Sequence, residues 1–388
     1  MIRHVRAAKA VQPASTAGSS TVGRNVRRVL DVVLLGLLPL LTLLPIATQL
    51  VARRRYIADG WFFDGHWLWI GWHRVAHGQN PYIDFLYPAP AAVLPAPLGF
   101  LGYRAAMISW TLLLIAAIVL ALLALGVRDW RCHTVALMSM PAISSIHLGT
   151  PTPLLLLAAA CAWRYRNRPW AVAAAVAFAV GFKLLLWPLF VWLVVTRFKT
   201  SLKAAAATVM LVLGCWAIIG FAGASSYGNR LTGTEDIDQF RGFSVIALAH
   251  RAGLALGGAH AVSVIVTLGC IAVIVAAGRW GGPTADRDAY IAALATSVVA
   301  SPVVWGHYVL VVYAALALAV PRFGIEWLLP LAFWVVPHQV NGGSATRIVL
   351  VLGLFVTMMV WFARREQILE WFRRRTALAR GEPAITAD

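Results

Sequence analysis

Residues Trp61–Pro97 read WFFDGHWLWIGWHRVAHGQNPYIDFLYPAPAAVLPAP, a stretch crowded with aromatic rings and poor in charge. The stretch follows the first long apolar segment of the chain and precedes the rest of the hydrophobic sequence. Trp and Tyr favour the membrane–water interface, where the ring contacts acyl chains and its polar atom stays in water. We therefore expect this stretch to lie at the mouth of a membrane cavity and to face water.

Local patterns divide this stretch and its continuation into helices and irregular backbone. Asp64–His77 has apolar residues at helical spacing, which predicts a helix lying in the interface. Gly78 suits a C-terminal cap and Pro81 cannot continue a helix, so the helix is expected to end there. Tyr87–Leu101 contains four prolines and predicts broken backbone, which is tolerated at membrane depth only beside protein or a water-filled cavity. A continuous helix is expected at Arg104–Leu125.

The composition identifies a membrane protein. The chain has 388 residues, of which 60% are hydrophobic and 12% charged. Apolar runs of about 20 residues, the length of a membrane-spanning helix, recur between Val29 and Ala363. They predict an all-α polytopic membrane protein with about ten to twelve transmembrane segments, some of them short and broken. The four cysteines stand alone within or beside apolar runs and are interpreted as packing residues.

The net charge of +18 comes from basic clusters at the ends of the apolar runs, which set membrane topology, so we expect no nucleic-acid partner. The expected parts are a disordered basic cytoplasmic arm at 1–28, a transmembrane domain at 29–363 and a basic cytoplasmic tail at 364–388. The loops 52–87 and 222–242 and the segment Ser301–His307 are then predicted to face the outside of the plasma membrane.

Two of the apolar segments are interrupted. Residues 132–163 contain the break His147–Pro153, and residues 169–196 contain the break Gly181–Lys183. Each flank has only about 13 to 17 residues, fewer than the roughly 20 that cross a bilayer, which predicts half-helices meeting within the membrane. Basic clusters stand on both sides of 169–196. If both clusters are cytoplasmic, this segment is a hairpin with Lys183 near its tip, and if only the second is, it is one broken span.

Few polar side chains are placed for chemistry. Of the 15 acidic residues, Asp64 stands out on the outer face among apolar and aromatic neighbours, where desolvation makes a carboxylate a stronger base. The alternative is that Asp64 caps the interfacial helix. Lys183 is a lone cation in an apolar stretch, which marks either a site for an anion such as phosphate or a side chain that snorkels to the interface. His307 lies between two spans, either as a donor to phosphate or as a packing residue.

The sequence contains little that indicates a metal or cofactor. His66 and His73 lie two helical turns apart, but no compact set of ligands surrounds them, so no metal site is expected. The chain has no phosphate-binding glycine-rich loop and no dinucleotide-binding fingerprint, and no cofactor is expected.

Several motifs together resemble a known family. They are the early loop acid, the Gly-x-x-Pro-Tyr element Gly78–Tyr82, the dipeptide Tyr87-Pro88, the lone lysine of Gly181–Lys183 and the run Ser301–Tyr308. Across most of residues 29–363 they resemble the actinobacterial polyprenyl-phosphate-sugar-dependent glycosyltransferases of GT-C fold. That group contains the mannosyltransferases of phosphatidylinositol mannosides and the arabinofuranosyltransferases of arabinan. The chain departs from the family pattern in having Tyr87-Pro88-Ala89 for Tyr-Pro-Pro and Gly149–Thr152 for Gly-Gln-x-Asn.

The resemblance implies an inverting glycosyltransferase at the outer face of the plasma membrane. It would move mannose or arabinofuranose from a polyprenyl-phosphate donor to a cell-envelope glycolipid or polysaccharide. Asp64 would be the general base, and Lys183 and His307 would bind the donor phosphate, with no nucleotide and no obligatory metal. The residues expected to contact the substrates are His66, Tyr82, Asp84, Tyr87, Ser244, Trp305 and Tyr308. The alternatives are a lipid or solute transporter or flippase, and a catalytically silent scaffold. The gathering of polar candidates at one face favours the enzyme.

Overall fold

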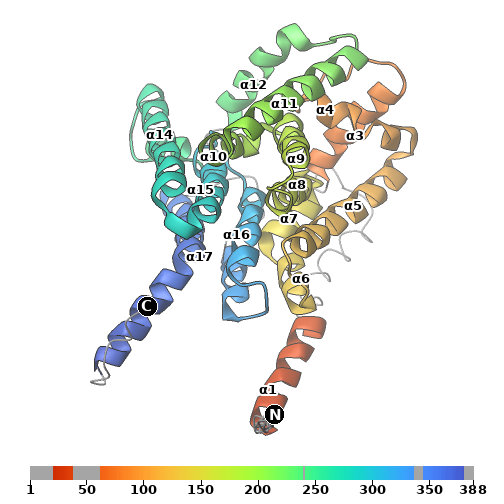
Figure 1. The fold of residues 1–388 in the computed structure, drawn as a ribbon. Helices are drawn as coiled ribbons and strands as arrows, with labels where there is room; N and C mark the ends of the chain where they lie inside the picture. The colour runs from red at the N-terminus through yellow and green to blue at the C-terminus, as the bar shows by residue number, and fades with distance from the viewer. Residues whose placement is uncertain (1–20, 38–61, 239–240, 336–343, 380–388) are drawn as a thin grey trace, which may run out of the picture.

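The computed structural model describes residues 21–37, 62–238, 241–335 and 344–379 (Figure 1). All regular elements in these ranges are helical, which confirms the predicted all-α fold. Four of the described helices are long and apolar enough to cross a membrane, namely α5 (Tyr103–Ala124), α11 (Phe198–Ile218), α14 (Leu256–Trp280) and α17 (Ala345–Ala379). Shorter apolar helices lie between them, so this part of the chain is a polytopic membrane protein that combines full-length and short helices.

The remaining helices are short, and those labelled η are 3₁₀-helical or π-helical segments. In chain order they are α1 (Thr21–Val32), η1 (Val33–Leu37), α3 (Phe63–Ala76), α4 (Ala89–Val93), η2 (Ala96–Phe100), α6 (Trp130–Leu137), α7 (Met140–Leu148), α8 (Thr152–Arg164), α9 (Pro169–Phe182), η3 (Leu184–Leu186), α10 (Pro188–Thr196), α12 (Ala224–Asp238), α13 (Val245–Arg251), η4 (Gly282–Thr284), α15 (Ala285–Val299), η5 (Gly306–Val311), α16 (Val312–Ala319) and η6 (Ile325–Val335).

Where local sequence signals are strong, the predicted elements are confirmed. The interfacial helix α3 ends as expected, with Gly78 in the left-handed conformation at φ 69°. The proline-rich segment forms only the short helices α4 and η2, and α5 agrees with the predicted helix to within one residue at each end. Both predicted breaks occur: α7 ends before Gly149, which has φ 72°, and α9 ends before Lys183, which is extended.

Two regions differ from the prediction. The last residues of the expected disordered arm, from Thr21 on, belong to α1. The polar loop 222–242 contains the helix α12, which tertiary packing of its aromatic residue stabilises. Parts of the predicted arm, of the first long apolar segment, of both loops and of the tail fall on 1–20, 38–61, 239–240 and 380–388, outside the described residues.

The segment 169–196 folds back on itself. Arg166, which follows α8, lies with its Nε 3.4 Å from a carboxylate oxygen of Asp286, and Arg197, which follows α10, donates to the same carboxylate at 2.7 Å. The beginning of α9 and the end of α10 therefore lie beside each other at the first turn of α15. This arrangement is the hairpin of the two alternatives, with Lys183 at its turn.

Further ion pairs gather around the base of this hairpin. Arg287 of α15 lies 3.2 Å from Glu366 of α17, and Arg365 of α17 lies 2.8 Å from Glu326 of η6. The two ion pairs together join these three helices. Most of these groups are partly exposed, and such pairs contribute little one at a time. They nevertheless mark one charged end of the helix bundle, while the opposite ends of α9 and α15 lead to the candidate site.

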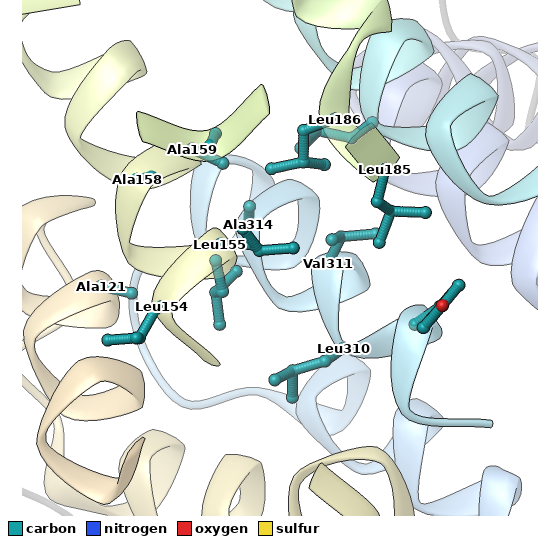
Figure 2. Close-up of a cluster of buried hydrophobic side chains, with 14 of the residues drawn as sticks. Ala121, Leu154, Leu155, Ala158, Ala159, Leu185, Leu186, Leu310, Val311 and Ala314 are labelled. Carbon is teal, nitrogen blue, oxygen red and sulfur yellow. The ribbon is translucent and has the colours of Figure 1, made fainter. Parts of the chain in front are cut away.

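Figure 2 shows a buried cluster of small and branched apolar side chains that includes residues next in the chain to Lys183 and Tyr308. Leu185 and Leu186 follow Lys183, Leu310 and Val311 follow Tyr308, and all four belong to the same buried cluster as Leu155 of α8. Lipid tails are as apolar as these side chains, so close packing rather than exclusion from water holds the cluster together. The cluster thereby fixes η3 and η5, the two short elements next to the candidate phosphate-binding residues.

Candidate active site

Asp64 lies in the first turn of α3 and is half-buried. The helix starts at Phe63, so the N-cap position belongs to Phe62 and not to Asp64, the alternative that the sequence left open. Phe62 has φ 48°, a conformation that is rare for a bulky residue, and its amide donates to the carbonyl of His147 at 2.8 Å. The start of α3 is therefore fixed against the break between α7 and α8.

Glycine makes this close approach possible. Gly149, at the break, has φ 72°, and a Cβ added to it would lie 2.9 Å from the Cα of Gly65 in α3. The carbonyl of Gly149 accepts a bond from Trp110 Nε1 at 2.8 Å, which ties the break to α5. The buried turn therefore holds the helix that carries Asp64 by direct backbone contact.

Tyr87 connects Asp64 to the next candidate residue. Burial, the charge of Asp64 and a hydrogen bond with the Asp64 carboxylate all raise the pKa of the Tyr87 hydroxyl well above its ordinary value. The hydroxyl therefore stays protonated and donates to Asp64. The face of the same ring lies 5.4 Å from Nζ of Lys183, within the range of a cation–π contact.

Lys183 lies between two tyrosine rings and next to His307. Its Nζ is 4.3 Å from the centroid of the Tyr308 ring, closer than to Tyr87, and its charge acts electrostatically on His307. The His307 ring meets the Tyr308 ring edge to face at 4.8 Å. The structure thus brings Asp64, Tyr87, Lys183, His307 and Tyr308, from four separate parts of the chain, into one cluster.

His307 has unused hydrogen-bonding capacity. Its side chain is only 1% exposed, and neither ring nitrogen has a hydrogen-bond partner among the residues that the structure describes. Most buried polar side-chain atoms in proteins have such a partner, and leaving one unsatisfied carries a cost in free energy. Together with the adjacent ammonium of Lys183, this imidazole can bind an anionic group that accepts hydrogen bonds.

Three further residues from the predicted set lie near the cluster. Tyr82 is buried, and its hydroxyl donates to the carbonyl of Tyr87 at 3.1 Å. Ser244 is also buried and caps α13 by accepting from the amide of Ala247 at 3.1 Å. Trp305 is half-buried and immediately precedes η5. Ser244 thus stabilises the start of α13, and Tyr82 contacts the segment that carries Tyr87.

His66 and Asp84 contact residues outside the cluster. His66 is two positions after Asp64 in a helix, which directs it to another face, and its ring contacts Trp67 and Tyr103. Burial lowers the pKa of His66. Asp84 is exposed and lies 3.5 Å from Arg74. Among the described residues, no group of three or more His, Cys, Asp or Glu side chains is arranged to hold a metal ion.

The sequence did not single out two residues that contact this region. Tyr227 and Arg230 of α12 donate to backbone carbonyls of Leu86 and Ile83, at 3.4 and 2.8 Å. These contacts join positions more than 140 residues apart, and no local pattern predicts them. The only available signal was the position of 222–242 in a loop predicted to share the face of 52–87.

The comparison with protein families bears on the middle of the chain. The pattern of glycosyltransferase family 87 matches residues 85–305, more than half of the chain. The match includes Tyr87 and Lys183, whereas Asp64 precedes it and His307 follows it closely. No curated protein and no solved structure matches. This match agrees with the glycosyltransferase class that the motifs imply, and the chain belongs to glycosyltransferase family 87.

Proposed function

We propose that this glycosyltransferase moves mannose or arabinofuranose from a polyprenyl monophosphate to a glycolipid or polysaccharide of the cell envelope. The observation that carries the proposal is the pairing of Lys183 with the buried imidazole of His307, whose two nitrogens have no partner in the described chain. The family supports transfer of a sugar, and this pair supports a phosphate as the group that leaves.

The pair suits a phosphate monoester because it combines a fixed charge with a hydrogen-bond donor. The ammonium of Lys183 supplies a positive charge, and a neutral imidazole can donate one N–H to a phosphate oxygen. Leu184, next to Lys183, is 51% exposed and offers an apolar surface to the lipid tail of the donor. A water-soluble sugar nucleotide would gain nothing from that surface.

The proposed reaction is a single displacement with inversion at the anomeric carbon. The acceptor hydroxyl attacks from the side opposite the phosphate, Asp64 takes the hydroxyl proton, and the bond from the anomeric carbon to the phosphate oxygen breaks. The electron pair stays with polyprenyl phosphate, whose growing negative charge Lys183 and His307 stabilise. The hydrogen bond from Tyr87 orients the carboxylate of Asp64.

The arrangement of charge supports an orientation for this site. The ion pairs and many basic residues gather at the base of the α9–α10 hairpin, the opposite end from the cluster. Basic segments next to membrane helices favour the cytoplasm. On this rule the cluster would face the outside, where a lipid-linked sugar and an envelope acceptor meet.

Asp64→Asn tests the proposal. The assay follows transfer of labelled mannose and arabinose from their polyprenyl phosphates to envelope glycolipids by the protein in detergent or membranes. Loss of a general base typically lowers the rate by about 10²- to 10⁴-fold, and we expect a loss in this range. Glu366→Gln, an exposed acid at the charged end, is the control and should keep wild-type activity.

Two outcomes would contradict the proposal. Unchanged transfer by Asp64→Asn would exclude Asp64 as the base. A wild-type protein that forms no product with either donor, but moves polyprenyl phosphates between leaflets, would favour the flippase alternative.

A further inference from the structure

The segment Ile83–Tyr87, between α3 and α4, lacks regular helix, yet side chains bind three of its carbonyls. Arg230 Nη1 donates to the carbonyl of Ile83 at 2.8 Å, and the Tyr227 hydroxyl donates to that of Leu86 at 3.4 Å. The Tyr82 hydroxyl donates to the carbonyl of Tyr87 at 3.1 Å. Two of the three donors come from α12, so this helix helps to fix a segment whose backbone is not part of a regular helix.

The start of α12 is fixed tightly against this segment. Gly223, just before α12, has φ 73°, and a Cβ added there would lie 2.4 Å from the Cβ of Tyr82. The Tyr82 ring stacks on Trp216 of α11 with centroids 4.5 Å apart and meets Tyr227 edge to face at 5.7 Å. In Figure 1, α12 follows α11 at the top of the molecule. Aromatic packing thus places α12 where Arg230 reaches the segment.

The held segment ends at the residue that connects the proposed base to the proposed phosphate-binding cation. Tyr87 donates to Asp64 and presents its ring to Lys183. A shift of the Ile83–Tyr87 backbone therefore changes the placement of Asp64 relative to the donor. Displacement of reacting groups by about 1 Å can lower a rate by about a hundredfold.

We infer that Arg230 is a positioning residue for sugar transfer, which acts through its hydrogen bond to the carbonyl of Ile83 on the segment that carries Tyr87. This inference rests on the proposed function, because it assumes that Asp64 and Lys183 act on one substrate pair. Arginine suits the task because its charged, planar group makes a strong hydrogen bond to a carbonyl and keeps its charge at any physiological pH.

The kinetic test compares three variants of the full-length protein, with polyprenyl-phosphate mannose and arabinose as donors. Arg230→Ala should lower kcat by about ten- to a hundredfold and leave the KM for the donor within about twofold, because it disturbs alignment more than donor binding. Arg230→Lys, which can also donate to a carbonyl, should recover most of the lost kcat. Arg74→Ala removes a positive charge that reaches the same segment only through the exposed Asp84, and should change kcat less than about twofold.

Hydrogen–deuterium exchange supplies a readout that does not depend on activity. In Arg230→Ala, amides of Ile83–Tyr87 should exchange at least about tenfold faster, whereas amides of α5 should exchange as in the wild type. Arg230→Lys should show an intermediate rate. These comparisons separate a local release of the segment from general unfolding.

Different results would refute sugar transfer by this protein and the positioning role of Arg230. A wild-type protein without transferase activity would refute the proposed function. An active wild type with an unchanged kcat in Arg230→Ala would refute the positioning role. Equal loss of kcat in Arg230→Ala and Arg230→Lys, with unchanged exchange at Ile83–Tyr87, would also overturn it.

Discussion

Replacing Lys183 with methionine removes one charge from the centre of the site and keeps an unbranched side chain. Nζ of Lys183 lies 4.3 Å from the Tyr308 ring centroid and 5.4 Å from that of Tyr87, so a bound phosphate would take a third side of the ammonium. At about 4 Å and an effective dielectric constant of about 20, the attraction between one phosphate charge and the ammonium is about 4 kcal/mol. Incomplete burial of Lys183 reduces this, and we take about 2 to 4 kcal/mol as the net effect.

This range corresponds to a decrease of roughly 30- to 900-fold in kcat/KM for the lipid donor. The charge on the leaving phosphate grows as the bond breaks, so kcat should fall in addition to a rise in donor KM. The assay titrates polyprenyl-phosphate sugar at fixed acceptor and measures labelled product. Stability should change little, because a cation–π contact contributes about 0.5 to 2 kcal/mol and methionine still packs on both rings.

Lys203→Met is the matched control for this variant. Nζ of Lys203 lies 5.0 Å from the Trp170 ring, a comparable cation–π contact that joins α11 to the start of α9, at the charged end of the bundle. Lys203→Met should keep kcat/KM for transfer within about twofold of the wild type and should lower the thermal midpoint about as much as Lys183→Met does. If Lys183→Met keeps more than a third of the wild-type kcat/KM, or loses no more than Lys203→Met, the phosphate-binding role is refuted.

Two further variants test the fold around the site. Asp286→Asn should lower the free energy of unfolding by about 1 to 3 kcal/mol, measured by thermal denaturation in detergent, because two arginines share this carboxylate at the hairpin base. Burial opposes ionisation of Asp286, but Arg197 outweighs it and holds the pKa below the ordinary 3.8. The ionised Asp286 carboxylate therefore contributes its full stabilisation above pH 3.8, and this stabilisation is lost as the pH falls through the lower pKa of the folded protein. The free energy of unfolding of Asp286→Asn should therefore fall less steeply with pH than that of the wild type below about pH 4. A variant as stable as the wild type at pH 7 would contradict this account. Gly149→Ala should lower both stability and kcat, because the added methyl group meets the backbone of α3. Gly126 is also left-handed but lies in open space, so Gly126→Ala should lose only about 1 kcal/mol of stability and keep its activity. Equal activity in the two alanine variants would show that this contact does not position α3.

The sequence predicts those parts of the fold that short-range chemistry controls. Helix α5 is a long apolar run, α3 has a helical spacing that ends at Gly78, and the breaks follow Gly149 and Lys183. Each of these signals lies within the element that it specifies. The choice between a hairpin and a broken span at 169–196 has no such signal, because Asp286, which joins its two ends, is about 90 residues away in the chain.

For the candidate site, the sequence indicates which residues matter but not that they lie close together. Asp64, Lys183 and His307 stand out in the sequence because each is a polar group in apolar surroundings, and such positions are costly without a function. Their proximity depends on packing between α3, α9 and η5, which composition does not reveal. The role of Tyr87 as a connection between Asp64 and Lys183 follows only from the geometry.

The length of α9 bears on the depth that Lys183 would reach in a bilayer. Helix α9 has 14 residues and extends about 21 Å, whereas the hydrocarbon core of a bilayer is about 30 Å thick. If the base of the hairpin lies at one membrane surface, a helix of this length brings the turn about two thirds of the way across the hydrocarbon core. Broken backbone at this depth requires protein or a polar cavity around it, and α4, η3 and η5 supply the protein. On the proposed function, a donor whose phosphate is attached to a lipid would approach this depth from the bilayer, whereas the acceptor hydroxyl would arrive from the side of Asp64 and α3. The short length of α9 and the position of α3 would then give the two proposed substrates separate routes.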